Sequence, residues 1–231
     1  MNHPLDNPVW ESLNRHHAAL ARKTADVARY HADAAPFVAV PAADAPVAAQ
    51  LAELVEAGES VLFVGPAPQL PPVWRVTPAS PIAQMTCTAH LAVEQGSPIV
   101  ELSQAEVADM LALTALVYPH YFRPRTIEMG RYVGIYHGTT LAAMAGERMR
   151  FDGHQEISAI CTHPDFGGRG HARRLIAVLT NDCLDGGRLP FLHVSHQNVR
   201  AKLLYERMGY RFRADIALTE VERGADSGCA D

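Results

Sequence analysis

The sequence predicts a mixed α/β (α+β) protein, in which a mostly antiparallel central sheet is flanked by helices and preceded by a smaller α+β domain. Two observations favour this class. In the C-terminal part of the 231-residue chain, short strand-like runs alternate with amphipathic helical patterns. In the N-terminal part, an alanine-rich stretch gives way to short runs that prolines interrupt. We expect an N-terminal domain over residues 1–98, a second domain over 99–223 and a disordered tail over 224–231.

Composition narrows the class of protein further. A hydrophobic content of 48% with 19% charged residues is ordinary for a globular chain and excludes wholesale disorder. A net charge of −5 argues against a nucleic-acid-binding module. No apolar run is long enough to cross a bilayer, and the N-terminus has no apolar signal core. The four cysteines show no CxxC spacing. We therefore expect a cytoplasmic protein that binds neither nucleic acid nor membrane.

The N-terminal domain is expected to contain two helices and three strands. Residues 18–30 have helical propensity but only a thin apolar face, whereas residues 47–57 carry a better apolar stripe that ends at Gly58. Strand-like runs follow at 61–64, 73–77 and 82–89. No pattern in this domain indicates chemistry.

The second domain has clearer boundaries. Ser103 and Glu106 form a capping box that opens a helix, which stops before Pro119. A polar, aromatic loop follows over residues 118–125. The remaining elements are expected as strands at 131–136, 140–149 and 154–161, a helix that Gly186 ends, a strand at 191–195, a helix that Asn198 caps, and a strand at 211–221.

The strongest chemical signal is a glycine-rich turn between a strand and a helix, with the sequence PDFGGRGHA over residues 164–172. Glycines let the backbone approach a ligand, and the helix start offers unpaired N–H groups that suit a phosphate. Arg169, Arg173 and Arg174 gather at this positive helix end, which indicates an anion there. The turn lacks the lysine and hydroxyl of a Walker loop. Arg173 also stands where a dinucleotide fingerprint needs a small residue.

Two motifs in register resemble the GNAT superfamily of acyl-CoA-dependent N-acyltransferases. Gly167-x-x-Gly170-x-Ala172 is similar to its R/Q-x-x-G-x-G/A turn, with Gly167 in place of the usual Arg or Gln. The helix N-x-x-A-x-x-L-Y-E-x-x-G-Y over residues 198–210 is similar to its N-x-x-A-x-x-L-Y-x-x-x-G-F helix. The resemblance covers residues 101–223. The two-part layout resembles the glycine N-acyltransferase-like branch, whose N-terminal half is similar to a degenerate copy of the same fold.

The resemblance implies that acetyl-CoA is the acyl donor. Its pantetheine arm would pair with the strand before the turn, its pyrophosphate would lie over the turn, and Tyr205 would protonate the departing CoA thiolate. The implied cofactor-binding residues are Ile160, Cys161, Thr162, Gly167, Gly168, Arg169, Gly170, His171, Ala172, Arg173, Asn198 and Tyr205. Acceptor contacts are expected at Tyr118, Phe122, Arg125 and Ser158. His193 and His196 have no evident third ligand, so we expect no metal.

The chemistry also needs a proton acceptor. A primary amine is protonated at pH 7, and freeing its lone pair costs about 4 to 5 kcal/mol. Glu147 and Glu156 lie on predicted strands and are the candidate bases, and the backbone N–H of Cys161 is a candidate for stabilising the tetrahedral oxyanion. The leading hypothesis is therefore an N-acetyltransferase that transfers an acetyl group directly to a primary amine of a small molecule or amino acid. A catalytically silent acyl-CoA-binding or sensing module, an enzyme using a longer acyl-CoA, and a homodimer remain open alternatives.

Overall fold

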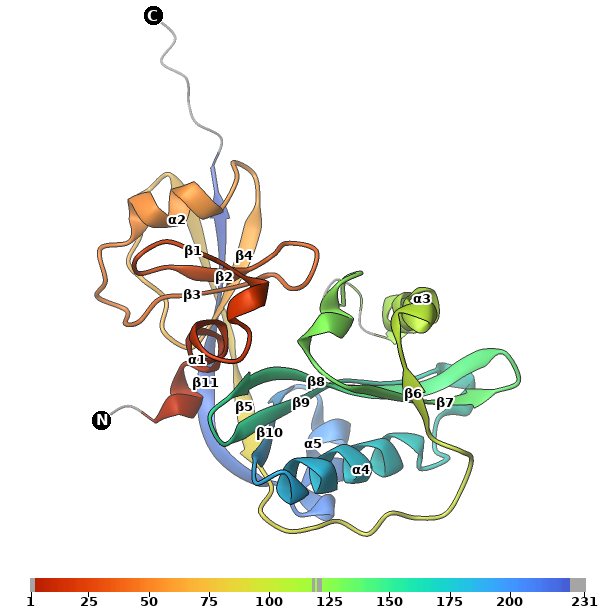
Figure 1. Cartoon of the computed structure of the whole chain (residues 1–231). Coiled ribbons are helices and arrows are strands. Elements are labelled where there is room, and N and C mark those ends of the chain that lie inside the picture. Colours follow the sequence, from red (N-terminus) through yellow and green to blue (C-terminus); the bar gives the residue numbers. More distant parts are fainter. Residues whose placement is uncertain (1–2, 118, 120–121, 225–231) are drawn as a thin grey trace, which may run out of the picture. The chain divides into compact units, whose positions relative to one another are not determined.

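The computed structural model describes residues 3–117, 119 and 122–224 (Figure 1). The predicted fold class is confirmed: mixed α/β, with mostly antiparallel strands flanked by helices. The chain forms two compact units. The first contains the residues up to Ala32, Pro36–Ile82 and the residues from Asp215 on; the second contains Asp33–Ala35 and Ala83–Ala214. The domain boundary at residues 98/99 stays a prediction.

The first unit is built on two α-helices and on strands of three to 13 residues. Its elements are η1 (Pro4–Asp6), α1 (Pro8–Asn14), η2 (Ala18–Leu20), β1 (Ala21–Lys23), β2 (Ala28–Tyr30), β3 (Phe37–Ala39), α2 (Ala48–Leu54), β4 (Ser60–Val64), the first part of β5 (Trp74–Thr86) and most of β11 (Arg211–Arg223). Strands β1, β2 and β3 are antiparallel neighbours, and β3 pairs with β4 in parallel through the crossover helix α2.

Two predictions for this unit are wrong. Residues 18–30 form the short helix η2 and the strands β1 and β2. The two strands are connected by a turn in which the Thr24 N–H donates to the Val27 carbonyl. All three residues of β2 are buried, so tertiary packing overrides the local helical propensity. The strands expected at 73–77 and 82–89 are one strand, β5, whose middle is exposed. Prolines 78 and 81 lie in this exposed middle part.

The second unit holds the sheet that carries the glycine turn. Its elements are β6 (Val100–Leu102), η3 (Gln104–Glu106), α3 (Val107–Val117), η4 (Thr126–Met129), β7 (Tyr132–His137), β8 (Thr140–Phe151), β9 (His154–Thr162), η5 (Pro164–Phe166), α4 (His171–Asp185), β10 (Leu189–Ser195) and α5 (Val199–Met208). The strand order is β5-β10-β9-β8-β7-β6. Strands β6 to β9 are antiparallel, and β9 pairs with β10 in parallel. The predicted capping box of Ser103 and Glu106 is present.

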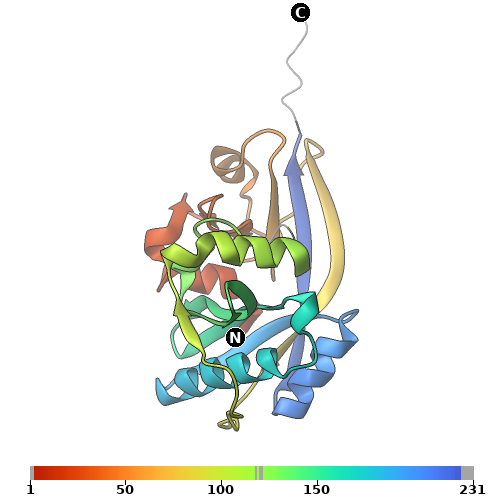
Figure 2. The same cartoon turned by 90° about the vertical axis from the view of Figure 1, so that its right-hand side faces the viewer.

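Helix α3 covers one face of this sheet, and α4 and α5 cover the other (Figures 1 and 2). On the α4 side, Ala143, Ala145 and Ile157 pack against Leu175 and Leu179. On the α3 side, Met144 and Cys161 pack in one cluster with residues of α3 and β7. Because side chains alternate along a strand, Glu156 and Ser158 lie on the α3 side, opposite to Ile157.

The two units repeat one connectivity. The order β1-β2-β3, helix α2, β4 corresponds to β7-β8-β9, helix α4, β10, with a parallel pair across the helix in both. The connection before α2, residues 40–47, contains no glycine, and α2 is only seven residues long. The first unit therefore lacks the glycine turn of the second.

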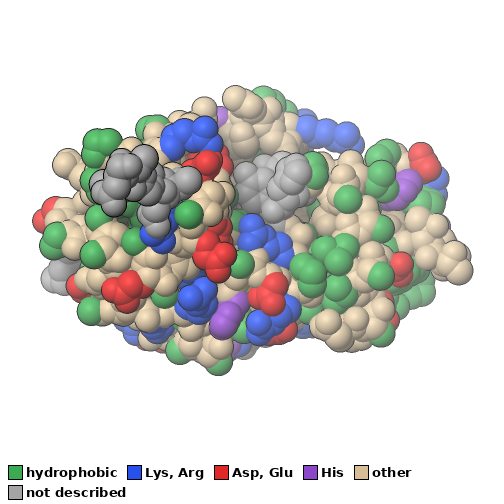
Figure 3. All heavy atoms as spheres, turned by 90° about the horizontal axis from the view of Figure 1, so that it is seen from above, with side chains coloured by type: hydrophobic (Ala, Val, Ile, Leu, Met, Phe, Trp, Pro, Cys, Tyr) green, Lys and Arg blue, Asp and Glu red, His purple; other side chains and the backbone are tan. Residues whose placement is uncertain are grey.

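Charged side chains of both signs are interspersed over the face that Figure 3 shows. No helix among the described residues is both long and apolar enough to span a membrane.

Candidate functional site

The central feature of the second unit is the place where β9 and β10 part. The two strands are in register only at His154–Glu156 with Leu189–Phe191. Strand β9 then continues to Thr162 and β10 to Ser195, and these continuations have no register partners in each other among the described residues. Facing backbone groups of two parted strands can pair with a third extended segment. We refer to this space as the β9–β10 opening.

A β-bulge lies on the β9 edge of the opening. Met144 is opposite Cys161 while Gly146 is opposite Ser158, so Ala159 and Ile160 have no register partners on β8. Ala159 has φ 51°, and it is the one residue other than glycine with positive φ in the described part of the chain. A bulge breaks the ladder locally and turns backbone groups away from the neighbouring strand. Ala159 and Ile160 are thus residues of β9 that lie outside the β8 register next to the opening.

The glycine turn follows directly at the end of β9. Gly168 and Gly170 both have φ 76°, a left-handed conformation that favours glycine. A Cβ on Gly168 would meet no atom within 4 Å. Gly170 is the N-cap residue of α4, and no side chain caps the helix there. The first N–H groups of α4 are therefore available to an anion.

The three arginines at this helix start have different partners. The Arg169 guanidinium lies 5.0 Å from the centre of the Phe166 ring. Arg173 forms an ion pair of 2.8 Å with the Glu94 carboxylate. Arg174 is buried and donates to the carbonyl oxygens of Glu94, at 2.9 Å, and Ser97, at 2.8 Å.

These contacts show which of the three arginines could bind the anion that the sequence predicts. Arg174 fixes the chain before β6 and has a structural role. A Glu94 carboxylate oxygen lies 3.8 Å from the place of a Cβ on Gly170, so in the free protein the chain's own carboxylate lies beside the start of α4. Arg169 and Arg173 remain the cations that an external anion can contact.

Histidines shape the other side of the turn. The Nε2 atoms of His137 and His171 are 3.3 Å apart, and the His137 ring stacks on Phe166 with centroids 4.8 Å apart. His171 is buried, and its Nδ1 has no hydrogen-bond partner among the described residues. Burial, together with His137, Arg169 and Arg174, lowers the pKa of His171. A neutral His171 adds no positive charge to the turn, so it acts by packing.

Tyr205 of α5 lies on the α4 side of the opening. It is buried in one cluster with Ile160, Leu192 and Val194, and no described residue hydrogen-bonds to its hydroxyl. Burial, and then the thiol of Cys161, raise the pKa of Tyr205 above its ordinary value. Tyr205 is therefore a neutral phenol at neutral pH, with a proton to donate.

Other residues of the predicted cofactor set have plain structural partners. Burial raises the pKa of Cys161 to about 12, so its side chain is a neutral thiol and a poor nucleophile. Asn198 caps α5: its side-chain oxygen accepts the N–H of Ala201 at 3.1 Å. Ile160 and Ala172 pack against the cluster that contains Tyr205. Thr162 is the last residue of β9.

The two candidate bases lie on opposite faces of the sheet. Glu147 is opposite Ile157 in the β8–β9 register and therefore lies on the α4 side. Its carboxylate accepts the backbone N–H of Arg131 at 3.2 Å, and the Cys183 sulfur lies 3.9 Å away. Glu156 lies on the α3 side and is fully buried. The two carboxylates are therefore alternative candidates for the base.

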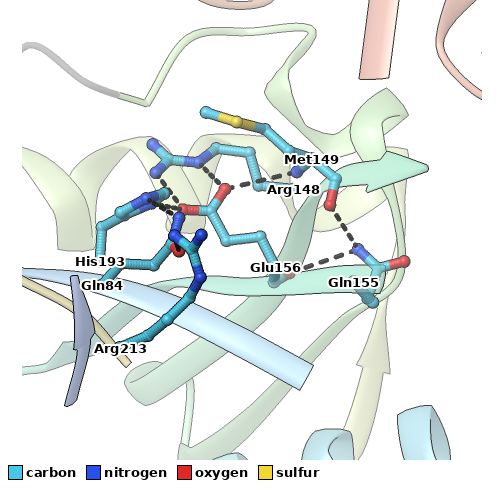
Figure 4. Close-up of polar contacts among 7 residues, drawn as sticks. All are labelled: Gln84, Arg148, Met149, Gln155, Glu156, His193 and Arg213. Carbon is cyan, nitrogen blue, oxygen red and sulfur yellow. Dashed lines mark hydrogen bonds and ion pairs between the residues drawn. The ribbon is translucent and has the colours of Figure 1, made fainter. Parts of the chain in front are cut away.

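Glu156 belongs to a row of polar side chains that crosses the sheet at the inner end of the opening (Figure 4). Its carboxylate accepts two hydrogen bonds of 2.7 Å from Arg148 and one of 2.8 Å from His193 Nδ1. Gln84 lies 3.0 Å from His193 Nε2, and Arg213 donates to Gln84 at 2.8 Å. The row takes one residue from each of five neighbouring strands, β11, β5, β10, β9 and β8. We call these five residues the polar row: Arg213, Gln84, His193, Glu156 and Arg148.

The donors of the polar row all point toward Glu156. Arg213 can only donate, so the Gln84 oxygen faces it and the Gln84 amide N–H faces His193. His193 Nε2 then accepts, and its Nδ1–H donates to Glu156. These two hydrogen bonds fix the orientation of the His193 ring. Burial alone would raise the pKa of Glu156, but Arg148 and His193 outweigh burial and hold the pKa well below its ordinary value.

The predicted acceptor contacts are dispersed. Tyr118 lies outside the described residues. The Phe122 ring contacts Tyr132, with centroids 5.7 Å apart, on the α3 side. Arg125 is engaged with Glu128, at 2.8 Å, and Asp33, at 3.3 Å. Sequence reasoning missed Gln84, Arg213 and the pairing role of His193, because residues this far apart in the chain share no local pattern.

Comparisons with known proteins agree with this geometry. A family model described as FR47-like protein matches residues 132–218, which include the opening, the glycine turn and α5. No curated protein matches the sequence. The solved structure of a GNAT-family protein from Novosphingobium aromaticivorans DSM 12444, described as an acetyltransferase, is 34% identical with a TM-score of 0.87, and the match covers 97% of this chain and 100% of that one.

More distant structures share the fold. A GCN5-related N-acetyltransferase from Kribbella flavida is 17% identical with a TM-score of 0.63, covering 97% of this chain and 96% of that one. A GCN5-related N-acetyltransferase-like protein from Streptococcus suis 89/1591 is 14% identical with a TM-score of 0.52, covering 93% and 92%.

The buried pairs of Glu156 make the stability of the protein depend on pH. Because its pKa is lowered on folding, its contribution is present above the pKa of the unfolded chain, about 4.3, and is lost as the pH falls toward the folded value. We expect Glu156→Gln to cost about 3 kcal/mol of unfolding free energy at pH 7 and to flatten the fall in stability below pH 4. Urea unfolding at several pH values measures both. Glu206→Gln, which changes an exposed carboxylate, should leave both within about 0.5 kcal/mol of wild type. Equal pH dependence in wild type and Glu156→Gln would contradict the ionised, paired state.

Proposed function

The chain belongs to the GNAT family, whose fold supports acyl transfer, and on that premise we propose that it is an N-acetyltransferase. It moves the acetyl group of acetyl-CoA to a primary amine of a small molecule or amino acid. The observation that carries this proposal is the β9–β10 opening, which leads directly from the glycine turn and the uncapped start of α4. The repeated connectivity of the two units also supports a place in the glycine N-acyltransferase-like branch.

The donor would lie along β9. The residues after Glu156 offer backbone groups to the two amides of the pantetheine arm, as an edge strand does to an added strand. The pyrophosphate would take the N–H groups of the glycine turn and of the first turn of α4. Arg169 and Arg173 would neutralise its charge, with Arg173 exchanging the Glu94 carboxylate for phosphate oxygens.

The site offers groups for both charges that develop during transfer, the oxyanion of the tetrahedral intermediate and the departing thiolate. The amides of Ala159 and Ile160, which the bulge leaves without register partners on β8, are better placed to stabilise the oxyanion than that of Cys161, which lies opposite Met144. When the C–S bond breaks, Tyr205 donates its hydroxyl proton to the departing thiolate sulfur. Burial supports this role because it keeps the phenol protonated until that step.

The acceptor amine must lose a proton as it attacks. Glu156 is the better-placed candidate base, since it shares the α3 side with Ser158 and Phe122. Its pairs with Arg148 and His193 lower its pKa, so it is a weak direct base, and transfer through a water molecule suits it better. Glu147, on the α4 side, is the second candidate.

Thiol release tests the proposed activity. We expect acetyl-CoA to release free thiol when a panel of amino acids and small primary amines is added, and to raise the thermal unfolding temperature without them. Protection by acetyl-CoA with no amine-stimulated release would instead identify a silent acyl-CoA-binding module. No protection and no release would contradict acyl-CoA binding altogether.

Tyr205→Phe tests the acid. Without the hydroxyl the thiolate must leave unprotonated, so we expect turnover to fall by roughly 100-fold while the CoA dissociation constant changes less than twofold. Tyr210→Phe is the matched control, because its buried hydroxyl is bonded to Thr180 Oγ1 at 2.8 Å and not exposed to the opening. That variant should lose about 1 kcal/mol of stability and keep its turnover. Normal turnover in Tyr205→Phe would remove Tyr205 as the acid.

A further inference from the structure

The polar row lies at the place where the β9–β10 opening ends. The last register pair of the two strands is Glu156 with Phe191, and the next residue of β10 on the same face is His193. The hydrogen bond of 2.8 Å between His193 and Glu156 therefore spans the two strands just beyond the point where they part.

We propose that His193 and Glu156 form the inner wall of the acyl-donor site and restrict the donor to short acyl groups, of about the size of acetyl and propionyl. The inference rests on the proposed function, since it assigns the substrate class of that same site. It makes His193 a residue that determines specificity.

The direction of the donor follows from the position of the glycine turn. The turn is at the outer end of β9, after Thr162, and the last register pair is at Glu156. At a rise of about 3.3 Å per residue, these two points are roughly 20 Å apart along the strand. A donor anchored at the turn by its pyrophosphate and paired along β9 thus points its thioester toward the polar row, and any additional methylene groups extend toward His193 and Glu156.

Protein atoms pack around the wall within the sheet and on both of its faces. Between the strands, the backbone pairs of His154–Glu156 with Leu189–Phe191 fill the sheet. On the α4 side, the buried Ile157 packs against Leu175 and Leu179. On the α3 side, the Glu156 side chain has no exposure and that of His193 only 4%.

The wall is also rigid and polar. Both nitrogens of His193 are engaged, by Glu156 and by Gln84, and Arg148 holds the Glu156 carboxylate through two further bonds. A longer alkyl chain would have to push His193 aside and leave buried polar groups without partners, which is costly. It would also bring methylene groups against an ionised carboxylate and gain no apolar contact there.

A series of CoA thioesters tests the wall. We expect wild-type kcat/KM to fall steeply from acetyl-CoA and propionyl-CoA to butanoyl-CoA and hexanoyl-CoA. His193→Ala removes the imidazole, so the hexanoyl-to-acetyl ratio of kcat/KM should rise at least tenfold. His193→Asn, which is smaller but still able to donate to Glu156, should lie between. Because both donors are measured on one preparation, this ratio does not depend on how much of a variant is folded.

His154→Ala is the matched control. His154 is on the same face of β9 but within the paired segment, on the closed side of Glu156. Its removal should leave the ratio unchanged. Wild type that uses hexanoyl-CoA as well as acetyl-CoA, or an unchanged ratio in His193→Ala, would overturn the proposal, as would an equal rise in His154→Ala.

Binding separates this proposal from the proposed function. The same thioesters are compared by the protection that each gives against thermal unfolding. If no amine is acetylated, the transferase proposal fails, but a protection profile that falls with chain length in wild type and flattens in His193→Ala still supports the wall. Uniform protection in wild type would overturn it whatever the turnover.

Discussion

Strand β9 is paired differently along its two edges. On one edge it pairs with β8 along most of its length, and on the other it leaves β10 after Glu156. The bulge at Ala159 and Ile160 allows both arrangements, because an extra residue bends the strand while its hydrogen-bond ladder with β8 resumes beyond the bulge. Its cost is a left-handed conformation at an alanine, of about 1 kcal/mol or more. The β9–β10 opening, the position of the glycine turn and the position of the proposed acid all depend on the separation of β9 from β10 after Glu156.

The charged groups are held differently at the two ends of the β9–β10 opening. At the inner end, the Glu156 carboxylate is held by hydrogen bonds from Arg148 and His193, so the site there is rigid. At the outer end, the cations of Arg169 and Arg173 are partly exposed, and the Glu94 carboxylate is held by one exchangeable ion pair. Buried pairs resist rearrangement, whereas exposed ones cost little to replace. The outer end therefore suits a charged ligand that comes and goes, and the inner end suits a fixed boundary.

Local sequence signals predicted the fold class, the glycine turn and the α5 helix, because each depends on residues close together in the chain. These signals failed where contacts between residues far apart in the chain determine the structure. The alanine-rich segment at 18–30 has helical propensity, yet burial on both sides makes Ala28–Tyr30 a strand. Alternation placed Glu156 and Ser158 on one face, but only the register with β8 shows that Glu147 lies on the other. The polar row joins Gln84, His193 and Arg213, whose spacing carries no periodicity.

Backbone hydrogen exchange with and without CoA measures whether the backbone groups of β9 beyond Glu156 receive the donor. We expect added CoA to slow exchange in residues 157–162 and 167–172 and to leave the already paired residues 154–156 unchanged. Protection confined to other segments, with 157–162 exchanging as in the free protein, would contradict it.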